Sequence, residues 1–489
     1  MRCCIGVDVG TSGVRAAAVD VRTGKLIHAA AVPYARQREK EASAWVDAVC
    51  EAVTALPEEA RRDARGICVD GTSATAVLVR SACDPEGARI DTGATRDIGG
   101  RRVGSLVNFE CCCQPMMYND APSADSMRNV HETLDALGCP ADHTVRAPTS
   151  TLSKLLHWYD EGLIVSDEDD SAHTPLTCID GSNACGTAEK KAEYEEAHPQ
   201  PRLAHQVDVI NHALTAEWFT DENNALKLGY DPGPDMRCFP SWLRDSKVAA
   251  ALPCRVVEPG EAVARVREEA SDVLGIGRDC VVVGGTTDSI AAFLAAGATE
   301  AGEAVTSLGS TLAIKIISTR RIESAAHGVY SHRLLGKWLV GGASNTGGAI
   351  LRKFFDDEQL KVLSDQIDPN VPSPLEYYPL LRPGERFPIA DAGLEPRLEP
   401  RPHDDDAAFL HGILESIARI EAMAFVKLRE LGCDPPVQKI KTCGGGAKNR
   451  TWTQIRERLI QVPVEEAANV DAAVGAAQLA RRAITGVAT

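Results

Sequence analysis

The chain has 489 residues, of which 44% are hydrophobic and 25% are charged, and this composition is typical of a soluble globular protein with two or three domains. The formal net charge of −17 argues against nucleic acid and against a membrane as partners, because both are anionic and attract basic surfaces. No apolar stretch reaches the roughly 18 residues that span a bilayer.

The 16 cysteines are scattered and include no Cys-x-x-Cys pair, so we expect reduced thiols in a cytosol-like compartment. Three of them, Cys111, Cys112 and Cys113, are adjacent and cannot pair with one another in good disulfide geometry. We favour an incidental loop over a metal or redox site for this triplet, since no zinc-ligand spacing surrounds it. The first strand begins at Cys4, which leaves no room for a signal peptide. These features predict a cytoplasmic protein, or a stromal one if an organelle transit peptide was removed.

Residues 4–20 predict a β-hairpin whose turn begins at Gly10. Glycine lets the backbone turn tightly and approach an anion, and the hydroxyl and N–H groups beside it can hold phosphate oxygens. Gly10, Thr11 and Ser12 are therefore candidate ATP-binding residues. Asp8 ends the first strand, and a carboxylate beside a phosphate needs a cation, so we interpret Asp8 as a Mg²⁺ ligand. The alternative is a carboxylate that only forms a hydrogen bond within the turn.

The spacing of apolar residues predicts helices over Ala42–Leu56 and Leu152–Tyr159, and strands over Gly66–Asp70 and Ala76–Val79. Residues 160–203 are rich in charge and proline and predict a solvated surface excursion, helical over 188–197. Proline and glycine punctuate residues 253–260, so we place the main domain boundary there. The expected domains are residues 1–256 and 257–489, and the last helix could pack back on the first domain.

The middle of the chain contains a candidate catalytic base. A helix is predicted over Glu261–Leu274, a buried strand over Asp279–Gly284 and a second helix over Ile290–Ala296. Asp288 follows that strand, at the carboxyl end where α/β proteins place ligands. Phosphorylation of an alcohol needs a base for the hydroxyl proton, and Asp288 is the best candidate. The alternative is that Thr287 or Asp288 is simply the N-cap of the helix.

The opening pattern returns three hundred residues later as TSLGSTL, within strands predicted over residues 303–317. Its Gly309 and Ser310 correspond to the glycine and hydroxyl of the first hairpin, and they are candidate ATP-binding residues for the same physical reason. Two such hairpins predict two similar lobes that face one polyphosphate. This layout is typical of a nucleotide-dependent phosphotransferase.

The last part of the chain contains a glycine-rich segment. Residues 366–406 are proline-rich and irregular; the predicted elements after them are a helix over Ala407–Leu431, a strand over Gln438–Thr442 and helices over Asn449–Gln461 and Asp471–Ile484. Three glycines follow the strand and offer a flat surface for a nucleoside. Gly445 and Gly446 are therefore candidate ATP-binding residues. Asn449 either caps a helix or binds the nucleotide, and Trp452 either stacks on adenine or belongs to the core. Neither a P-loop nor a Gly-x-Gly-x-x-Gly fingerprint is present.

Together these segments resemble the FGGY family of carbohydrate kinases. The matches are VDVGTSGVRAAAVD at the start, GGTTDSIAAFLAAGA and VTSLGST in the middle, and GGGAKNRTWTQIRERLIQVPVE and DAAVGAAQLA at the end. The resemblance implies an α/β fold of two actin-like (ribonuclease H-like) ATPase domains with an interdomain cleft, the sugar mainly on the first domain and ATP mainly on the second. It implies Asp288 as the base and Asp8 near Mg²⁺ and the sugar. The nucleoside would lie at Gly445, Gly446, Asn449 and Trp452.

Within the family, the chain is most similar to the plant and cyanobacterial D-ribulose kinases, which are often labelled xylulose-kinase-like. The similar segments are CVDGTSATAVLV, MMYND, DENNALKLGYD and GVYSHRLLGKWLVGGASNTGGAILRKFF. Xylulokinases proper carry a Met-His pair against the sugar where this chain has Ser73 and Ala74, which argues against D-xylulose. Ser73 can donate to a sugar hydroxyl, and Asp120 either lines the same pocket or forms a structural turn. Residues 92–114 and 165–203 depart from the family pattern as insertions.

These features predict a Mg²⁺- and ATP-dependent ketopentose kinase that converts D-ribulose to D-ribulose 5-phosphate, with Asp288 as general base. The alternative acceptors are D-xylulose, sedoheptulose or a polyol. A second alternative is an actin-like ATPase that switches conformation or assembles without phosphorylating a metabolite, and such a protein needs no acceptor base. The expected partners are the sugar and ATP, bound to a monomer or a homodimer.

Overall fold

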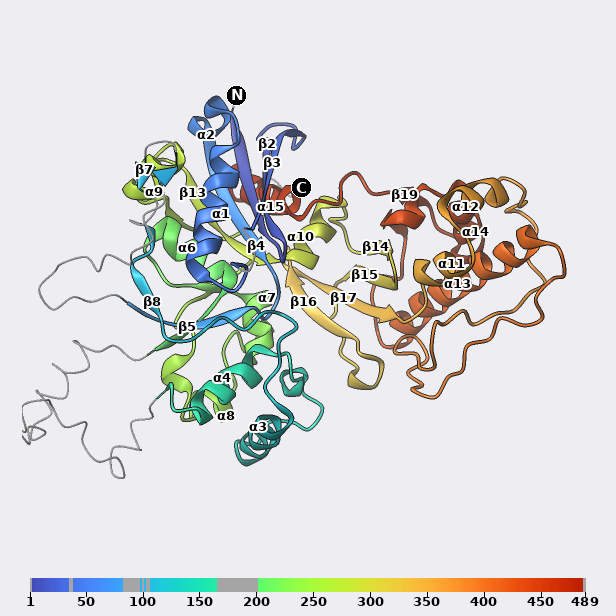
Figure 1. The fold of residues 1–489 in the computed structure, drawn as a ribbon, viewed down its shortest axis with the longest axis horizontal. Coiled ribbons are helices and arrows are strands. Elements are labelled where there is room, and N and C mark those ends of the chain that lie inside the picture. Colours follow the sequence, from blue (N-terminus) through green and yellow to red (C-terminus); the bar gives the residue numbers. More distant parts are fainter. Residues whose placement is uncertain are drawn as a thin grey trace, which may run out of the picture. The chain divides into compact units, whose positions relative to one another are not determined.

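The computed structural model describes residues 2–34, 38–81, 97–98, 101–102, 106–164 and 201–486 of the chain. The chain divides into two compact units. The first contains residues 1–291 together with the C-terminal segment from Ala476 onward, and the second contains Ala292–Gly475. Each unit has its own mixed β-sheet and hydrophobic core, and Figure 1 shows the elements of both.

The main sheet of the first unit has six strands in the described part of the chain. In order across the sheet they are β12 (Ala262–Arg265), β13 (Val281–Thr287), β4 (Ala64–Gly71), β1 (Cys3–Val9), β2 (Gly13–Asp20) and β3 (Leu26–Pro33). Strand β1 is antiparallel to β2 and parallel to β4, which is also parallel to β13. The carboxyl ends of β1, β4 and β13 therefore share one edge of the sheet.

Both faces of this sheet are covered. Every residue of β1 is buried, as its sequence CCIGVDV predicts for a strand that has no solvent face. On one face, α1 (Ala42–Thr54) and α6 (Gln206–Thr215) share a hydrophobic cluster with the strands. The other face is covered by α15 (Ala472–Thr485), which packs so closely that a Cβ on Gly66 would lie 3.0 Å from Ile484. Gln478 Nε2 of the same helix donates a hydrogen bond to Gly24 O at 2.6 Å. The end of the chain thus completes the unit that its beginning forms.

A smaller sheet lies beyond β4 in the chain and carries further helices of the first unit. In order, its strands are β8 (Phe109–Cys111), β5 (Ala76–Ser81) and β9 (Arg202–His205). Two separate two-stranded sheets consist of β10 (Thr220–Asp221) with β11 (Val256–Val257), and of β6 (Asp97–Ile98) with β7 (Arg101–Arg102). The remaining helices are α2 (Glu58–Arg62), α3 (Ala124–Ala136), α4 (Thr151–Asp160), α7 (Glu222–Ala225), α8 (Ser241–Arg244), α9 (Glu268–Leu274) and α10 (Asp288–Ala295). Helices α3 and α4 bury Leu134 and Leu155 in a hydrophobic cluster that also contains Leu78 of β5.

The sheet of the second unit repeats the strand directions of the first. In order it contains β16 (Tyr330–Leu334), β17 (Lys337–Ser344), β15 (Leu312–Ser318), β14 (Glu303–Leu308), β18 (Lys439–Cys443) and β19 (Val464–Glu466). Strands β17, β15 and β14 are antiparallel neighbours, and β14, β18 and β19 are parallel neighbours. The series β3, β2, β1, β4 and β13 has the same directions. The two similar hairpins of the sequence are therefore equivalent parts of two similar sheets.

The helices of the second unit are α11 (Gly348–Phe354), α12 (Asp357–Ser364), α13 (Asp406–Glu430) and α14 (Arg450–Ile460) in the described part of the chain. The long helix α13 and α14 pack together in a cluster that includes Ile413, Ile417, Trp452 and Ile455. Between α12 and α13 the chain has no helix or strand, as the proline-rich sequence of residues 366–406 predicts. No described helix is both long and apolar enough to cross a membrane.

The structure differs from the prediction for residues 261–274. A single helix was expected there, but strand β12 and the short helix α9 occupy this segment. Residues 262–265 pair with the edge of β13, and Arg267 precedes α9 as its N-cap residue. This pairing also places residues 257–291 in the first unit, whereas we expected the division between residues 256 and 257. The helix expected over 188–197 lies outside the described residues.

Candidate active site

The carboxyl edge of the first sheet gathers three aspartates. Asp8 of β1 lies across from Asp70 of β4, and Asp70 lies across from Thr286 of β13. Asp288 follows β13 immediately and opens helix α10. Neighbouring strands are about 4.8 Å apart, so β1 and β13, which flank β4, run roughly 10 Å apart. Two residues that are distant in the sequence and were both predicted as functional thus belong to one edge of one sheet.

Asp8 has a charged partner on the opposing strand of its hairpin. Its Oδ2 accepts a hydrogen bond from Arg15 Nη1 at 2.9 Å, and the two residues are paired across β1 and β2. The Asp8 side chain is only 7% exposed, whereas that of Arg15 is 47% exposed. A buried carboxylate needs such a partner because burial removes the water that would otherwise solvate its charge. Arg15 was not singled out from the sequence, where it looks like any polar residue of an alternating strand.

The turn of the first hairpin is closed by a main-chain hydrogen bond and exposes two hydroxyl side chains. Gly10 N donates to Gly13 O at 3.0 Å, and the side chains of Thr11 and Ser12 are exposed beyond this closure. A Cβ on Gly13 would lie 2.3 Å from Val32 O, so only glycine fits where β3 passes the turn. The hydroxyls predicted from the sequence are therefore accessible at a rigid turn.

Asp288 is half-buried at the first turn of α10. Its Oδ1 accepts a hydrogen bond from Ser289 N at 2.6 Å. This contact agrees with the interpretation that the residue stabilises the helix N-terminus, where carboxylates are favoured. The same contact fixes the orientation of the carboxylate, so the structural and the catalytic interpretations do not exclude each other.

The predicted sugar ligand Ser73 lies in the turn that follows β4. Its Oγ is buried and has no hydrogen-bond partner among the residues that the structure describes. Thr72 is fixed by Gln206, whose Oε1 accepts from Thr72 N at 3.1 Å and from Thr72 Oγ1 at 2.9 Å. Ala74 has a left-handed backbone with φ 62°, which is an unfavourable conformation for alanine. The Ser73 hydroxyl thus lies buried in a turn that contacts with Gln206 hold and that includes a strained residue.

Lys154 of α4 connects this turn with the one that carries Asp120. Its Nζ donates to Ala74 O at 2.7 Å and to Met117 O at 2.6 Å. The side chain is completely buried, and this burial lowers the pKa of Lys154 to about 8. Lysine is almost never fully buried without such partners. Sequence reasoning missed Lys154 because a single lysine in an amphipathic helix is normally solvated.

Asp120 is engaged in a turn of its own. Its Oδ2 accepts from Met117 N at 2.9 Å and from Lys40 Nζ at 2.8 Å. Although partial burial acts in the opposite direction, these two hydrogen bonds bring the pKa of Asp120 below its ordinary value. The structural-turn interpretation of Asp120 therefore describes its contacts, and Lys154 places that turn beside the Ser73 turn. A sugar contact by Asp120 stays a prediction.

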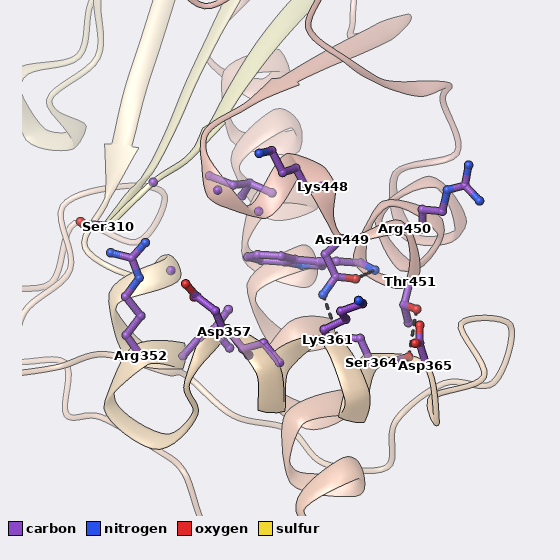
Figure 2. Close-up of a pocket in the computed structure, with 18 residues that line it drawn as sticks. Ser310, Arg352, Asp357, Lys361, Ser364, Asp365, Lys448, Asn449, Arg450 and Thr451 are labelled. Atoms are coloured by element: carbon purple, nitrogen blue, oxygen red, sulfur yellow. Dashed lines mark hydrogen bonds between the residues drawn. The ribbon is translucent and has the colours of Figure 1, made fainter.

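The second unit contains a pocket of about 790 Å³. It brings together all the nucleotide-binding residues predicted for this part of the chain: Gly309, Ser310, Gly445, Gly446, Asn449 and Trp452. They come from the end of β14, from the segment after β18 and from the first turn of α14. Figure 2 shows Ser310 on one side of the pocket and Asn449, Arg450 and Thr451 on the other. The cavity therefore joins two predicted features. One is the hairpin of β14 and β15, which is called the second phosphate hairpin below because it is predicted to bind phosphate, and the other is the glycine-rich segment.

Trp452 serves both as a core residue and as a wall of this pocket. It is 1% exposed and belongs to the hydrophobic cluster of the second unit. A Cβ on Gly446 would lie 2.7 Å from its ring carbon Cζ3, so the glycine segment rests directly against the indole. Asn449 caps α14 by accepting from Trp452 N at 2.9 Å, and its Nδ2 donates to Ser364 Oγ at 2.8 Å. Both residues thus support the wall of the pocket from within the protein.

The charged groups of the pocket were not predicted, and three of them, Arg352, Asp357 and Lys361, belong to helices α11 and α12, which were not expected. Four basic residues and two acidic residues line it: Arg352, Lys361, Lys448 and Arg450, with Asp357 and Asp365. Figure 2 shows Arg352 and Asp357 on the Ser310 side of the pocket. A local excess of positive charge in a chain with a net charge of −17 favours an anionic ligand at this place.

A metal site made of protein ligands alone is absent from the described residues, in which no group of three His, Cys, Asp or Glu side chains could hold an ion. Mg²⁺ does not require one, because it is usually bound by one or two carboxylates together with water and substrate phosphates. Asp8 and Asp70 are neighbours in register on β1 and β4, and these two carboxylates could contribute to such a site.

The sequence is similar to a known protein family and to known kinases. Residues 304–484 match the C-terminal domain of the FGGY family of carbohydrate kinases. The chain is 25% identical to a xylulose kinase of Streptomyces coelicolor over 497 aligned residues, which cover 99% of this chain and 88% of that enzyme. The part of the chain that this model matches, residues 304–484, is a C-terminal domain of the FGGY family of carbohydrate kinases.

Two further relatives bear on the length and fold of the chain. It is 25% identical to a xylulose kinase of Streptomyces rubiginosus over 325 residues, a match that spans 65% of this chain but only 54% of that enzyme. The crystal structure of a xyloylose kinase from Brucella ovis superposes with a TM-score of 0.72 at 20% identity and covers 99% of this chain and 91% of that one. The prediction of two actin-like α/β domains is confirmed by this likeness.

Proposed function

We propose that this protein is an FGGY kinase that phosphorylates a ketopentose with ATP, and that its preferred acceptor is D-ribulose, which gives D-ribulose 5-phosphate. The observation that carries the proposal is the position of Asp8 and Asp288 at the carboxyl edge of one sheet, beside an exposed Gly-Thr-Ser turn. A metal-binding carboxylate, an acceptor base and phosphate-binding groups are the parts that phosphoryl transfer to an alcohol requires.

In this proposal Asp288 accepts the proton of the attacking sugar hydroxyl as the γ-phosphoryl group leaves ATP. Its hydrogen bond from Ser289 N keeps the carboxylate oriented. Thr11 and Ser12 of the first hairpin donate to phosphate oxygens in this proposal. Mg²⁺, held by Asp8 with Asp70 beside it, would neutralise phosphate charge when it is bound.

The choice of D-ribulose rests on the Ser73 turn. The hydroxyl of Ser73 is buried and has no partner among the described residues, so a sugar hydroxyl that bonds to it satisfies a polar group that otherwise costs free energy. The second candidate is D-xylulose, because relatives that are 25% identical are named xylulose kinases. The two ketopentoses differ in the configuration of one hydroxyl, which a single serine can read.

A panel of acceptors tests this proposal. The assay follows ADP release with each acceptor. We expect kcat/KM for D-ribulose to be at least tenfold higher than kcat/KM for D-xylulose, sedoheptulose or a polyol. Ser73→Ala should reduce this preference, because it removes the hydroxyl that reads the sugar. Turnover that is highest with another acceptor would contradict D-ribulose, and ATP turnover that never depends on an added sugar would instead favour an actin-like switch.

The assignment of the pocket to ATP predicts the effect of filling it. A Cβ on Gly445 would meet no atom within 4 Å, so Gly445→Val places its side chain in the pocket and displaces nothing in the protein. We expect the Kd of ATP to rise at least tenfold, while the thermal midpoint stays within a few degrees of the wild-type value. Calorimetric titration measures the first and differential scanning fluorimetry the second. An unchanged Kd would exclude this pocket as the nucleotide site.

A further inference from the structure

The second phosphate hairpin is supported by the loop of residues 344–349. Three main-chain hydrogen bonds join them: Gly348 N to Gly309 O at 2.8 Å, Ala349 N to Ser310 O at 3.1 Å, and Leu312 N to Thr346 O at 2.7 Å. The approach is close, since a Cβ on Gly347 would lie 2.6 Å from Thr311 Cα. Both Gly309 and Ser310 line the pocket. Any shift of the loop therefore moves the residues that would bind phosphate.

The loop is in turn held by one buried carboxylate, that of Glu385, which is 3% exposed. Its Oε2 accepts from Ser344 Oγ at 2.6 Å and from Tyr378 OH at 2.9 Å. Its Oε1 accepts from Asn345 N at 2.7 Å and from Arg386 N at 2.8 Å. Four hydrogen bonds to a charged group are strong enough to fix the geometry of everything they join.

Further hydrogen bonds extend this arrangement into the loop. Ser344 Oγ accepts from Thr346 N at 3.1 Å, and Thr346 supplies the carbonyl that binds the hairpin. Asn345 Nδ2 donates to Gly384 O at 2.9 Å, and its Oδ1 accepts from Arg386 Nε at 2.7 Å. The contacts thus run without a break from Glu385 through residues 344–346 to the hairpin.

We propose that Glu385 is a positioning residue for the nucleotide, which holds the second phosphate hairpin in the conformation that binds ATP. This inference rests on the proposed function, in which the pocket of the second unit takes ATP. It gives a role to the proline-rich segment of residues 366–406, which the sequence showed only as irregular. The competing explanation is that the Glu385 carboxylate stabilises the unit and has no particular effect on the hairpin.

Two hydroxyls that bind the same carboxylate oxygen separate these explanations. Ser344 and Tyr378 both donate to Glu385 Oε2, but only Ser344 belongs to the loop behind the hairpin. Ser344→Ala and Tyr378→Phe each remove one hydroxyl from a buried site and leave the carbon skeleton in place. If Glu385 serves stability alone, the two variants behave alike. If it positions the hairpin, only Ser344→Ala weakens nucleotide binding.

The experiment titrates Mg²⁺-ATP into the wild-type protein, Glu385→Gln, Ser344→Ala and Tyr378→Phe, and records thermal unfolding of each. We expect the Kd of ATP to rise at least tenfold in Glu385→Gln and Ser344→Ala and to stay within twofold in Tyr378→Phe. Hydrogen exchange of residues 309–312 should accelerate in the same two variants. The KM of the sugar should not change, because the contacts lie wholly in the second unit.

The outcomes distinguish this inference from the function on which it rests. Equal Kd values in Ser344→Ala and Tyr378→Phe would overturn the positioning role, even if both proteins were less stable than the wild type. If Glu385→Gln does not fold, the comparison of these two variants still decides. Failure of the wild-type protein to bind ATP would refute the proposed function and this inference with it.

Discussion

Asp288→Asn should lower the kcat of sugar phosphorylation by about 10³-fold and leave the Kd of ATP unchanged. Asparagine keeps an oxygen that can accept the hydrogen bond from Ser289 N, so the first turn of α10 should remain intact. Its amide cannot take up the proton of the attacking hydroxyl, and a general base contributes roughly 10²- to 10⁴-fold to the rate. The sugar KM should change little, because the substitution is nearly isosteric.

Asp279→Asn is the matched control for this prediction. Asp279 lies just before β13, at the opposite end of the strand from Asp288, and its exposed side chain forms a salt bridge with Arg265 at 3.3 Å. An exposed pair of this kind contributes little, so both kcat and stability should be unchanged. A kcat for Asp288→Asn within tenfold of the wild-type value would show that Asp288 is not the base, and its contact with Ser289 would then be purely structural.

The sequence predicted the strands that carry the candidate site because their signals are local. A mainly apolar run such as residues 3–9, in which Asp8 is the one charged residue, is typical of a strand buried on both faces, and a glycine with hydroxyl neighbours marks a tight turn. The two hairpins were therefore found with nearly the observed bounds, as β1 with β2 and β14 with β15. Their equivalence in two sheets follows from the same strand directions in both units.

Elements whose existence depends on distant partners were not predicted. Strand β12 forms only because the edge of β13 is available to pair with it, and nothing within residues 261–265 distinguishes a strand from a helix. Helices α11 and α12 are short, and in the sequence they look like a charged surface segment. For this reason the basic residues of the pocket, such as Arg352, could not be assigned to it.

The supporting residues of the candidate site were the hardest to predict. Lys154 and Glu385 act through main-chain and side-chain contacts with segments that are distant in the sequence. Their charges suggest solvent exposure in any sequence pattern, since buried charges are rare. Their roles become visible only when burial and hydrogen-bond partners are known. The sequence therefore indicated residues that are proposed to contact ligands, whereas the structure adds the residues that hold those segments in place.

A buried ion pair in the second unit leads to the prediction with the largest effect on stability. Arg456 of α14 donates to Glu421 of α13 through Nε at 2.6 Å and Nη2 at 2.7 Å, and both side chains are at most 1% exposed. Thr306 of β14 donates to Glu421 at 2.6 Å, and Thr442 of β18 accepts from Arg456 at 2.7 Å. The pair thus joins two helices to β14, the first strand of the second hairpin, and to β18, which precedes the glycine-rich segment.

Arg456→Met should destabilise the protein by about 3–5 kcal/mol, because it leaves the Glu421 carboxylate buried without its partner charge. Urea denaturation measures this loss, and the double variant Arg456→Met with Glu421→Met should recover much of it, since no buried charge then remains. Lys439→Met is the control: it removes a half-exposed ion pair with Glu465 on the same sheet and should cost less than about 1 kcal/mol. A double variant less stable than Arg456→Met alone would contradict this account. It would mean that the hydrogen bond from Thr306 to Glu421 stabilises the sheet independently of Arg456.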